Sequence, residues 1–256
     1  MELLQETWYL FLRLLRATLR MPVFVVISIV QPALWVLLFG QLFRSVTTIP
    51  GFESGSYVQF LAPGISIMTA LFGAAYSGMG LLGDIDRGVL DRMLATPVSP
   101  SALIAGRILH SAFLVILQAG IILVVAGLLG ARPHGGITGL LVVFLAAFLL
   151  GAAFASFSNA LALLARRQEL VIAVMNFTVL PMTFLSSMIM SRNLMPGWIG
   201  AVSRFNPVNW AVTAARDGFE GRASSEIAFC LALLAGFALV CAFLATRAFG
   251  QYRKSL

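Results

Sequence analysis

The chain has 256 residues, of which 60% are apolar and only 11% are charged, whereas about 25% of residues are charged in an average soluble domain. So few polar residues cannot cover the surface of a water-soluble monomer, and the composition excludes a disordered chain as well. The net charge of +7 comes from basic residues scattered between long apolar runs. That distribution indicates an integral membrane protein and not a nucleic-acid-binding protein. The length fits a single domain, residues 1–256.

Residues 1–20 predict an amphipathic helix. Its polar side chains form one narrow stripe on a helical wheel, and apolar residues such as Trp8, Phe11 and Leu15 form the broad remainder. A helix of this kind lies in the membrane interface with its arginines toward the headgroups. The alternative is a packed helix of a cytoplasmic cap. Pro22 marks a break before the first membrane span.

Six apolar segments along the chain are each long enough to cross a membrane. They cover approximately residues 21–43, 58–82, 103–130, 137–165, 170–190 and 227–246. With both termini in the cytoplasm, the inner segments hold eleven Lys and Arg residues and the outer segments hold six, as the positive-inside bias requires. We therefore expect an all-α protein with six transmembrane helices, a cytoplasmic N-terminus and a cytoplasmic C-terminus.

The connection between the second and third spans, residues 84–101, is short and charged. Asp84, Arg87 and Asp91 are spaced so that both neighbouring pairs meet on one helical face, and an apolar face is formed by Leu90, Met93 and Leu94. Pro97 ends this helix, and Ser99-Pro100 is the N-cap and first position of the next one. The pattern predicts a short amphipathic helix on the membrane surface, too small to fold alone, that must dock on something else.

The connection after the fifth span, residues 191–226, is too long for a turn and too apolar for a solvated loop. Asn206-Pro207 is a second N-cap pair, opening a helix that Gly218 or Gly221 closes. Short apolar segments of this kind suggest two re-entrant helices in the outer leaflet. The alternative is an interfacial anchor around Trp198 and Trp210 with no role in transport.

Catalytic patterns are missing from the sequence. Lys254 is the sole lysine and no glycine loop precedes it, so this chain does not hydrolyse ATP by itself and is not expected to be an enzyme. No cluster of His, Cys and carboxylates with metal-ligand spacing occurs, and no cofactor is expected. Asp84, Asp86 and Asp91 could hold magnesium for a lipid-phosphate transferase, but the alternating arginines favour a solvated helix face. A channel is a third possibility.

Aromatic residues suggest a route for apolar cargo, because an apolar, aromatic path suits hydrophobic or amphipathic molecules. The chain has 20 phenylalanines, although each one alone is more often core or lipid-facing. Our candidates for the path, which include the few polar side chains within spans, are Gln31, Trp35, Phe39, Tyr76, Asn176 and Phe184.

Together these features resemble the permeases of type-2 ATP-binding-cassette (ABC) exporters. The stretch DRGVLDRMLATPVSPSALIAGR, Asp86 to Arg107, is similar to that family's charged, Gly, Leu, acidic and Thr-Pro pattern. FNPVNWAVTAAR, Phe205 to Arg216, resembles its Asn-Pro followed by arginine. LPMTFLSS, Leu180 to Ser187, is closer to the daunorubicin-resistance-like multidrug branch than to the polysaccharide branch. One departure is Val89, where the family usually has Thr or Ser.

The resemblance implies a permease subunit of the bacterial cytoplasmic membrane. No nucleic-acid partner is expected. By the same resemblance we expect this subunit to export hydrophobic or amphipathic small molecules, drugs or lipids; the alternative cargo is a lipid-linked polysaccharide. Two separate ATPase subunits, which carry ATP and magnesium, grip a cytoplasmic coupling helix, and a second identical or related permease chain completes the path through the membrane lipid. The expected ATPase contact comprises Asp84, Asp86, Arg87, Leu90, Asp91, Arg92 and Leu94. The expected re-entrant segment comprises Trp198, Asn206, Pro207, Trp210 and Arg216.

Overall fold

The computed structural model describes residues 2–20, 22–43, 45, 56–94, 99–189, 194–222 and 225–254, and these ranges contain helices and turns without strands. The helices are α1 (Glu2–Leu19), α2 (Pro22–Leu42), α3 (Tyr57–Ala75), α4 (Ser77–Asp86), α5 (Val89–Leu94), α6 (Pro100–Leu128), α7 (Gly136–Ala165), α8 (Gln168–Phe184), α9 (Gly197–Ser203), α10 (Pro207–Glu220) and α11 (Ser225–Lys254). The all-α prediction is confirmed for this part of the chain.

Four helical segments are long and apolar enough to cross a membrane. They are Tyr57–Asp86, Ser101–Leu128, Gly136–Ala165 and Ser225–Tyr252. Two further apolar stretches, Val30–Leu42 in α2 and Gln168–Phe184 in α8, are shorter. Each of the six predicted segments thus contains a helix within the described residues, but a length and composition sufficient for a full crossing are found for four, and the six-span count stays a prediction.

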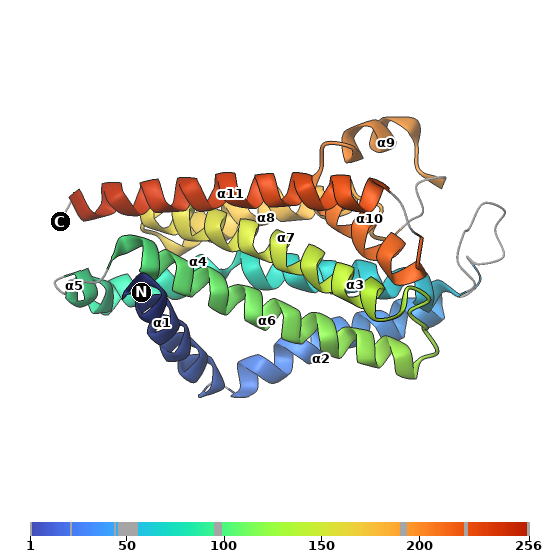
Figure 1. Ribbon diagram of the computed structural model, residues 1–256, viewed down its shortest axis with the longest axis horizontal. Coiled ribbons are helices and arrows are strands. Elements are labelled where there is room, and N and C mark those ends of the chain that lie inside the picture. Colours follow the sequence, from blue (N-terminus) through green and yellow to red (C-terminus); the bar gives the residue numbers. More distant parts are fainter. Residues whose placement is uncertain are drawn as a thin grey trace.

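The long helices run side by side along the molecule, with α3 in contact with α2, α6, α7, α8 and α10 (Figure 1). The α5 segment and both termini lie toward one end of the bundle, whereas α9, α10 and the α6–α7 turn lie at the other (Figure 1). This alternation agrees with the predicted order of inner and outer connections. We call the two ends the α5 end and the α10 end; which of them faces the cytoplasm stays a prediction.

Small residues allow the central helices to approach closely. On α7, Ala147, Ala155 and Asn159 are fully buried. Where α4 crosses α7, a Cβ added at Gly78 would lie 2.3 Å from the carbonyl oxygen of Ser158. The seam of small residues expected on this helix therefore packs against its neighbours, as such seams do in membrane bundles.

The charged segment after α4 differs from its prediction. A single helix was expected from residue 84 to Pro97, but α4 ends at Asp86 and a separate short helix, α5, spans Val89–Leu94. The break lies at Gly88, whose φ of 62° is a left-handed conformation that glycine adopts without steric cost. Pro97 itself lies outside the described residues. The chain therefore turns between α4 and α5.

Candidate functional site

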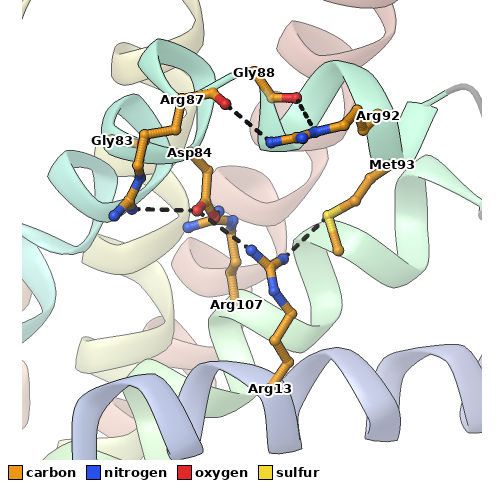
Figure 2. A network of polar contacts seen from close by, with 8 residues as sticks. All are labelled: Arg13, Gly83, Asp84, Arg87, Gly88, Arg92, Met93 and Arg107. Atoms are coloured by element: carbon orange, nitrogen blue, oxygen red, sulfur yellow. Dashed lines mark hydrogen bonds and ion pairs between the residues drawn. The ribbon is translucent and has the colours of Figure 1, made fainter. Parts of the chain in front are cut away.

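A cluster of charged side chains joins α1, α4 and α6 at the α5 end. We call it the Asp84 junction; it comprises Arg13, Asp84, Arg87, Met93 and Arg107 (Figure 2). Arg107 donates to Oδ2 of Asp84, and both side chains are almost fully buried. At the other oxygen, Oδ1, Arg13 Nη2 lies 3.4 Å away and Arg87 Nη2 lies 3.5 Å away.

Three helices that are distant in sequence supply this junction. Asp84 lies in the last turn of α4, Arg107 in the second turn of α6 and Arg13 in the middle of α1. A charge buried among apolar helices requires an opposite charge. The Asp84–Arg107 pair therefore links α4 to α6, and Arg13 adds α1 to the same pair.

Polar contacts and one close approach hold α1 against α6. Near the start of α1, the carboxylate of Glu6 accepts hydrogen bonds from the backbone N–H and the hydroxyl of Ser99, the N-cap of α6, at 3.1 and 2.8 Å. Near its end, Thr18 Oγ1 lies 2.9 Å from Nε2 of His110. Between them, a Cβ added at Gly106 would lie 2.9 Å from Leu10. Thus α1 is packed against the bundle, as the alternative of a packed helix predicted. It also has two exposed faces.

One exposed face of α1 is apolar and the other is basic. Leu4, Trp8 and Leu19 are exposed on the apolar face, and on the basic face Tyr9 lies between the exposed Arg16 and Arg20. Exposed aromatic residues beside arginines are typical of a helix at a membrane interface. Arg13 differs from Arg16 and Arg20 because its guanidinium reaches Asp84 in the Asp84 junction, while its side chain stays 40% exposed; the orientation of these arginines toward headgroups stays a prediction.

The predicted ATPase contact residues divide into two groups. Asp86, Arg87 and Arg92 are exposed. Asp84 and Leu90 are buried within this chain, at 6% and 0% exposure. The expectation of a solvated face is therefore wrong for Asp84, and Leu90, expected on the apolar face, is covered by this chain itself. The reason is that Asp84 pairs with Arg107 and Leu90 belongs to the hydrophobic core. The side chains of Asp91 and Leu94 lie outside what the structure describes.

The predicted path residues lie in two places. Tyr76, at the break between α3 and α4, donates a hydrogen bond of 2.7 Å to Oδ1 of Asn176 on α8. On α2, Trp35 and Phe39 stack with ring centroids 4.8 Å apart. The remaining two, Gln31 on α2 and Phe184 on α8, are exposed on the surface of this chain. The structure therefore joins one pair across two helices and leaves the others on the outer faces of α2 and α8.

The α10 end contains both predicted short helices. The exposed one is α9, with Trp198 65% exposed, whereas α10 is buried against α7, α11 and α3. The N-cap prediction is confirmed, because the side chain of Asn206 accepts from the N–H of Val208, next to Pro207. The C-cap is Gly221, with φ of 74°. Their depth in a membrane stays a prediction.

Side chains of α10 also bind the chain that follows α8. The amide of Asn206 donates to the carbonyls of Met182 and Leu185 at 2.7 and 3.0 Å, and Arg216 donates to Met188 at 3.2 Å. These bonds satisfy carbonyl groups at and beyond the end of α8 that have no partner within the helix. Trp210 donates instead to Arg204. Asn206 and Arg216 are therefore buried positions that fasten α10 to α8.

Sequence reasoning missed two buried polar residues that connect elements of the fold. Arg107 was treated as a residue that flanks a span, although it lies inside α6 and is 7% exposed; an arginine followed by a long apolar run was the available signal that it needs a buried partner. Gln59 was not considered. Its side-chain amide donates to the carbonyl of Arg132 and accepts from the N–H of the same residue, each at 2.7 Å. Gln59 thus joins α3 to the α6–α7 turn.

The described side chains give no support to a magnesium site at Asp84, Asp86 and Asp91. Arginine nitrogens lie near both oxygens of Asp84, and Asp86 is exposed. Within the described residues, no group of three or more His, Cys, Asp and Glu side chains could hold a metal ion. The junction is instead built to connect helices.

Comparison with known proteins assigns the family. The model of the family described as ABC-2 type transporter matches residues 5–219. The chain belongs to this family. The ABC-2 match runs from α1 almost to the end of α10 and so includes the Asp84 junction and the α10 contacts. It confirms the resemblance that the two sequence motifs indicated.

Several relatives of this ABC-2 transporter chain are permeases by name. It is 28% identical over 236 residues to the daunorubicin resistance ABC transporter permease protein DrrB1 of Streptomyces coeruleorubidus, covering 92% of this chain and 82% of that protein. It is 31% identical over 217 residues to the putative transport permease ycf38 of Cyanophora paradoxa, covering 83% and 73%. It is 27% identical over 232 residues to the probable doxorubicin resistance ABC transporter permease protein DrrC of Mycobacterium tuberculosis, covering 90% and 83%.

Proposed function

We propose that this ABC-2 permease is the membrane subunit of an exporter that moves hydrophobic or amphipathic small molecules, drugs or lipids, out across the bacterial cytoplasmic membrane. The family match over residues 5–219 carries the proposal. Relatives named for daunorubicin and doxorubicin resistance support an apolar, drug-like cargo. ATP and magnesium are bound by two separate ATPase subunits.

The cargo path is assigned to the outer faces of α2 and α8, which both contact α3. Large apolar side chains lie exposed there, among them Leu38 on α2 at 65% and Phe177 on α8 at 82%. A second permease chain, identical or related, would present the same faces, and the two chains would together enclose a path with apolar walls. The Tyr76–Asn176 hydrogen bond would supply polar groups where α3 passes into α4.

The ATPase contact is assigned to the exposed side of the α4–α5 segment. It comprises Asp86 and Arg92, whose side chains are exposed, together with Asp91 and Leu94, which the sequence pattern alone assigns to it; Arg87 lies at its edge, beside Asp84. A force applied there would reach α1 and α6 through the Asp84 junction, because Asp84, in the last turn of α4, binds Arg13 of α1 and Arg107 of α6. Closure of the ATPase dimer would then move α1, α4 and α6 together, and the path would alternate between inward-open and outward-open states.

The test is export by the assembled complex. The chain, produced with its ATPase subunit, is purified and reconstituted in vesicles, and ATP-dependent movement of daunorubicin is measured beside ATP hydrolysis. We expect Asp91→Arg to abolish transport while the protein stays inserted and ATP hydrolysis continues. The matched control is Arg132→Glu, a charge reversal at an exposed residue of the α10 end, which should transport normally.

Three outcomes would contradict the proposal. If no nucleotide-binding subunit copurifies with the chain, the exporter assignment fails. If ion currents arise from this chain alone without ATP, it is a channel. If Asp91→Arg exports normally, the assigned contact is wrong although the exporter can still be right. The ratio in which the chains copurify also distinguishes a homodimer of permeases from a pair of related chains.

A further inference from the structure

Positive charge exceeds negative charge at the Asp84 junction. Three guanidinium groups surround one carboxylate, and the buried Arg107 already neutralises it. Arg13 and Arg87 approach the remaining oxygen only to 3.4 and 3.5 Å, whereas a charge-assisted hydrogen bond is about 2.7–2.9 Å long. Two guanidinium groups are therefore held near a carboxylate that does not satisfy them.

The other contacts of these two arginines are weak or local. Arg13 Nη1 donates to the thioether sulfur of Met93 at 3.1 Å, and a thioether is a weak acceptor. Arg87 Nε donates to the carbonyl of Gly83 in its own turn at 2.7 Å. Both groups therefore retain N–H donors for a stronger acceptor, such as an anion with several oxygens.

Both arginines are accessible from outside the bundle. The side chain of Arg13 is 40% exposed and that of Arg87 is 67% exposed, compared with 8% for Arg107. Figure 2 shows them reaching Asp84 from different elements, Arg13 from α1 and Arg87 from the turn after α4. An anion entering between these elements would meet two guanidinium groups, with the Asp84–Arg107 pair behind them.

The position of α1 indicates where such an anion comes from. Trp8 and Tyr9 are exposed on the same helix that carries Arg13, and aromatic residues of this kind lie at headgroup level in a membrane. Basic pockets between membrane helices bind phosphate-bearing headgroups, and the planar guanidinium matches phosphate oxygens in pairs.

We propose that the Asp84 junction binds a phosphate group, with Arg13 and Arg87 donating to its oxygens, and that this phosphate belongs to the headgroup of an anionic phospholipid. The bound lipid joins α1 to the α4–α5 turn from outside, as Asp84 joins them from inside. The proposal requires that the chain lies in a membrane; it does not require the proposed transport function.

Lipid binding to the full chain tests this site. The protein is purified in a non-ionic detergent and titrated with short-chain phosphatidylglycerol, phosphatidylcholine and inorganic phosphate, and bound molecules are counted by native mass spectrometry. Arg13→Gln and Arg87→Gln should each weaken phosphatidylglycerol binding about fivefold. Arg16→Gln is the matched control, because Arg16 is exposed on α1 one turn beyond Arg13 and outside the junction; it should change binding less than about twofold.

Each outcome decides the proposal. Selective loss in the two junction variants supports the phosphate site, and persistence of the lipid in millimolar inorganic phosphate assigns it to a headgroup. Displacement by inorganic phosphate would overturn the lipid source and assign the site to a free phosphate. An equal loss of phosphatidylglycerol binding in all three variants would indicate a general effect of surface charge and overturn the site. Unchanged binding in the two junction variants would overturn it as well. If Arg13→Gln misfolds, the exposed Arg87→Gln decides alone.

Discussion

At the α5 end, arginines from three segments converge on the carboxylate of Asp84, whereas at the α10 end Asn206 and Arg216 bind backbone carbonyls and close glycine contacts join α10 to its neighbours. Charges attract over several ångströms, and the 3.4 and 3.5 Å separations at Asp84 can lengthen with a gradual loss of energy. Amide hydrogen bonds weaken steeply when they lengthen or bend.

Glycine contacts make the α10 end more rigid still. A Cβ at Gly139 on α7 would lie 2.1 Å from the carbonyl oxygen of Gly218 on α10, so the two backbones lie in direct contact. The N–H of Gly135 donates to the carbonyl of Phe219 at 3.1 Å. From the difference in bonding we expect the α5 end to tolerate small displacements of its charged side chains, and the α10 end to hold α7, α8 and α10 in one arrangement.

The largest effect is expected from Asp84→Asn. It leaves Arg107 charged and buried without a carboxylate, which costs about 3–5 kcal/mol of unfolding free energy. Thermal unfolding of the purified protein in detergent measures the loss, with the exposed Asp86→Asn as control. Adding Arg107→Gln should recover part of the stability, because the double variant no longer buries a lone charge. Equal stability of the Asp84→Asn and Asp86→Asn variants would show that charge does not hold this end together.

Gly139→Ala should have the second largest effect, a loss of about 1–3 kcal/mol of unfolding free energy, because the added methyl group must separate α7 from α10. The control is Gly236→Ala on α11, where a Cβ meets no heavy atom within 4 Å. That variant should keep or slightly raise the unfolding temperature. If both variants unfold at the same temperature, the α10 end is less tightly packed than its glycine contacts indicate.

Asn206→Ala should lower the free energy of unfolding by about 1–2 kcal/mol. It removes the N-cap of α10 together with two hydrogen bonds to carbonyls near the end of α8. Asn206→Asp separates these roles, because a carboxylate keeps the cap but has no N–H to donate. Unfolding midpoints for the two variants should therefore differ. An aspartate variant as stable as the wild type would assign the whole effect to the cap.

The smallest effect is expected from Arg87→Gln. Its side chain is 67% exposed, and exposed ion pairs contribute about 0.2–1 kcal/mol. The unfolding midpoint should barely move, and it should move less at high salt because the Debye length shortens. A loss approaching that of Asp84→Asn would mean that the three arginines act as one unit at Asp84.

Local features were predictable because short-range chemistry determines them. Ser99 and Asn206 cap α6 and α10, with Pro100 and Pro207 at the first helical positions, as the Ser-Pro and Asn-Pro pairs predicted. Gly221 closes α10. These motifs act within three or four residues and depend little on the rest of the fold, so single-sequence reasoning found them.

The role of Asp84 was not predictable in the same way. Spacing placed it opposite Arg87 on a charged helix face, and that contact exists at 3.5 Å. Its main partner, Arg107, is 23 residues away across a turn, and Arg13 is 71 residues away. No periodicity in one segment shows which of two other helices will pack against it, so the pattern indicated a solvated carboxylate where the fold buries one.

The amino-acid sequence alone determined that this chain is a helical membrane protein and where several of its helices begin and end. The reason is that the length of an apolar segment and the chemistry of a helix cap are properties of neighbouring residues. The sequence also carried the two motifs that indicated the family. Tertiary structure alone decided which charges meet: Asp84 turns inward to Arg107, Arg13 leaves the basic face of α1, and Asn206 reaches α8. Those pairings depend on how whole helices pack, since a buried polar group takes the partner that the neighbouring helix brings within reach.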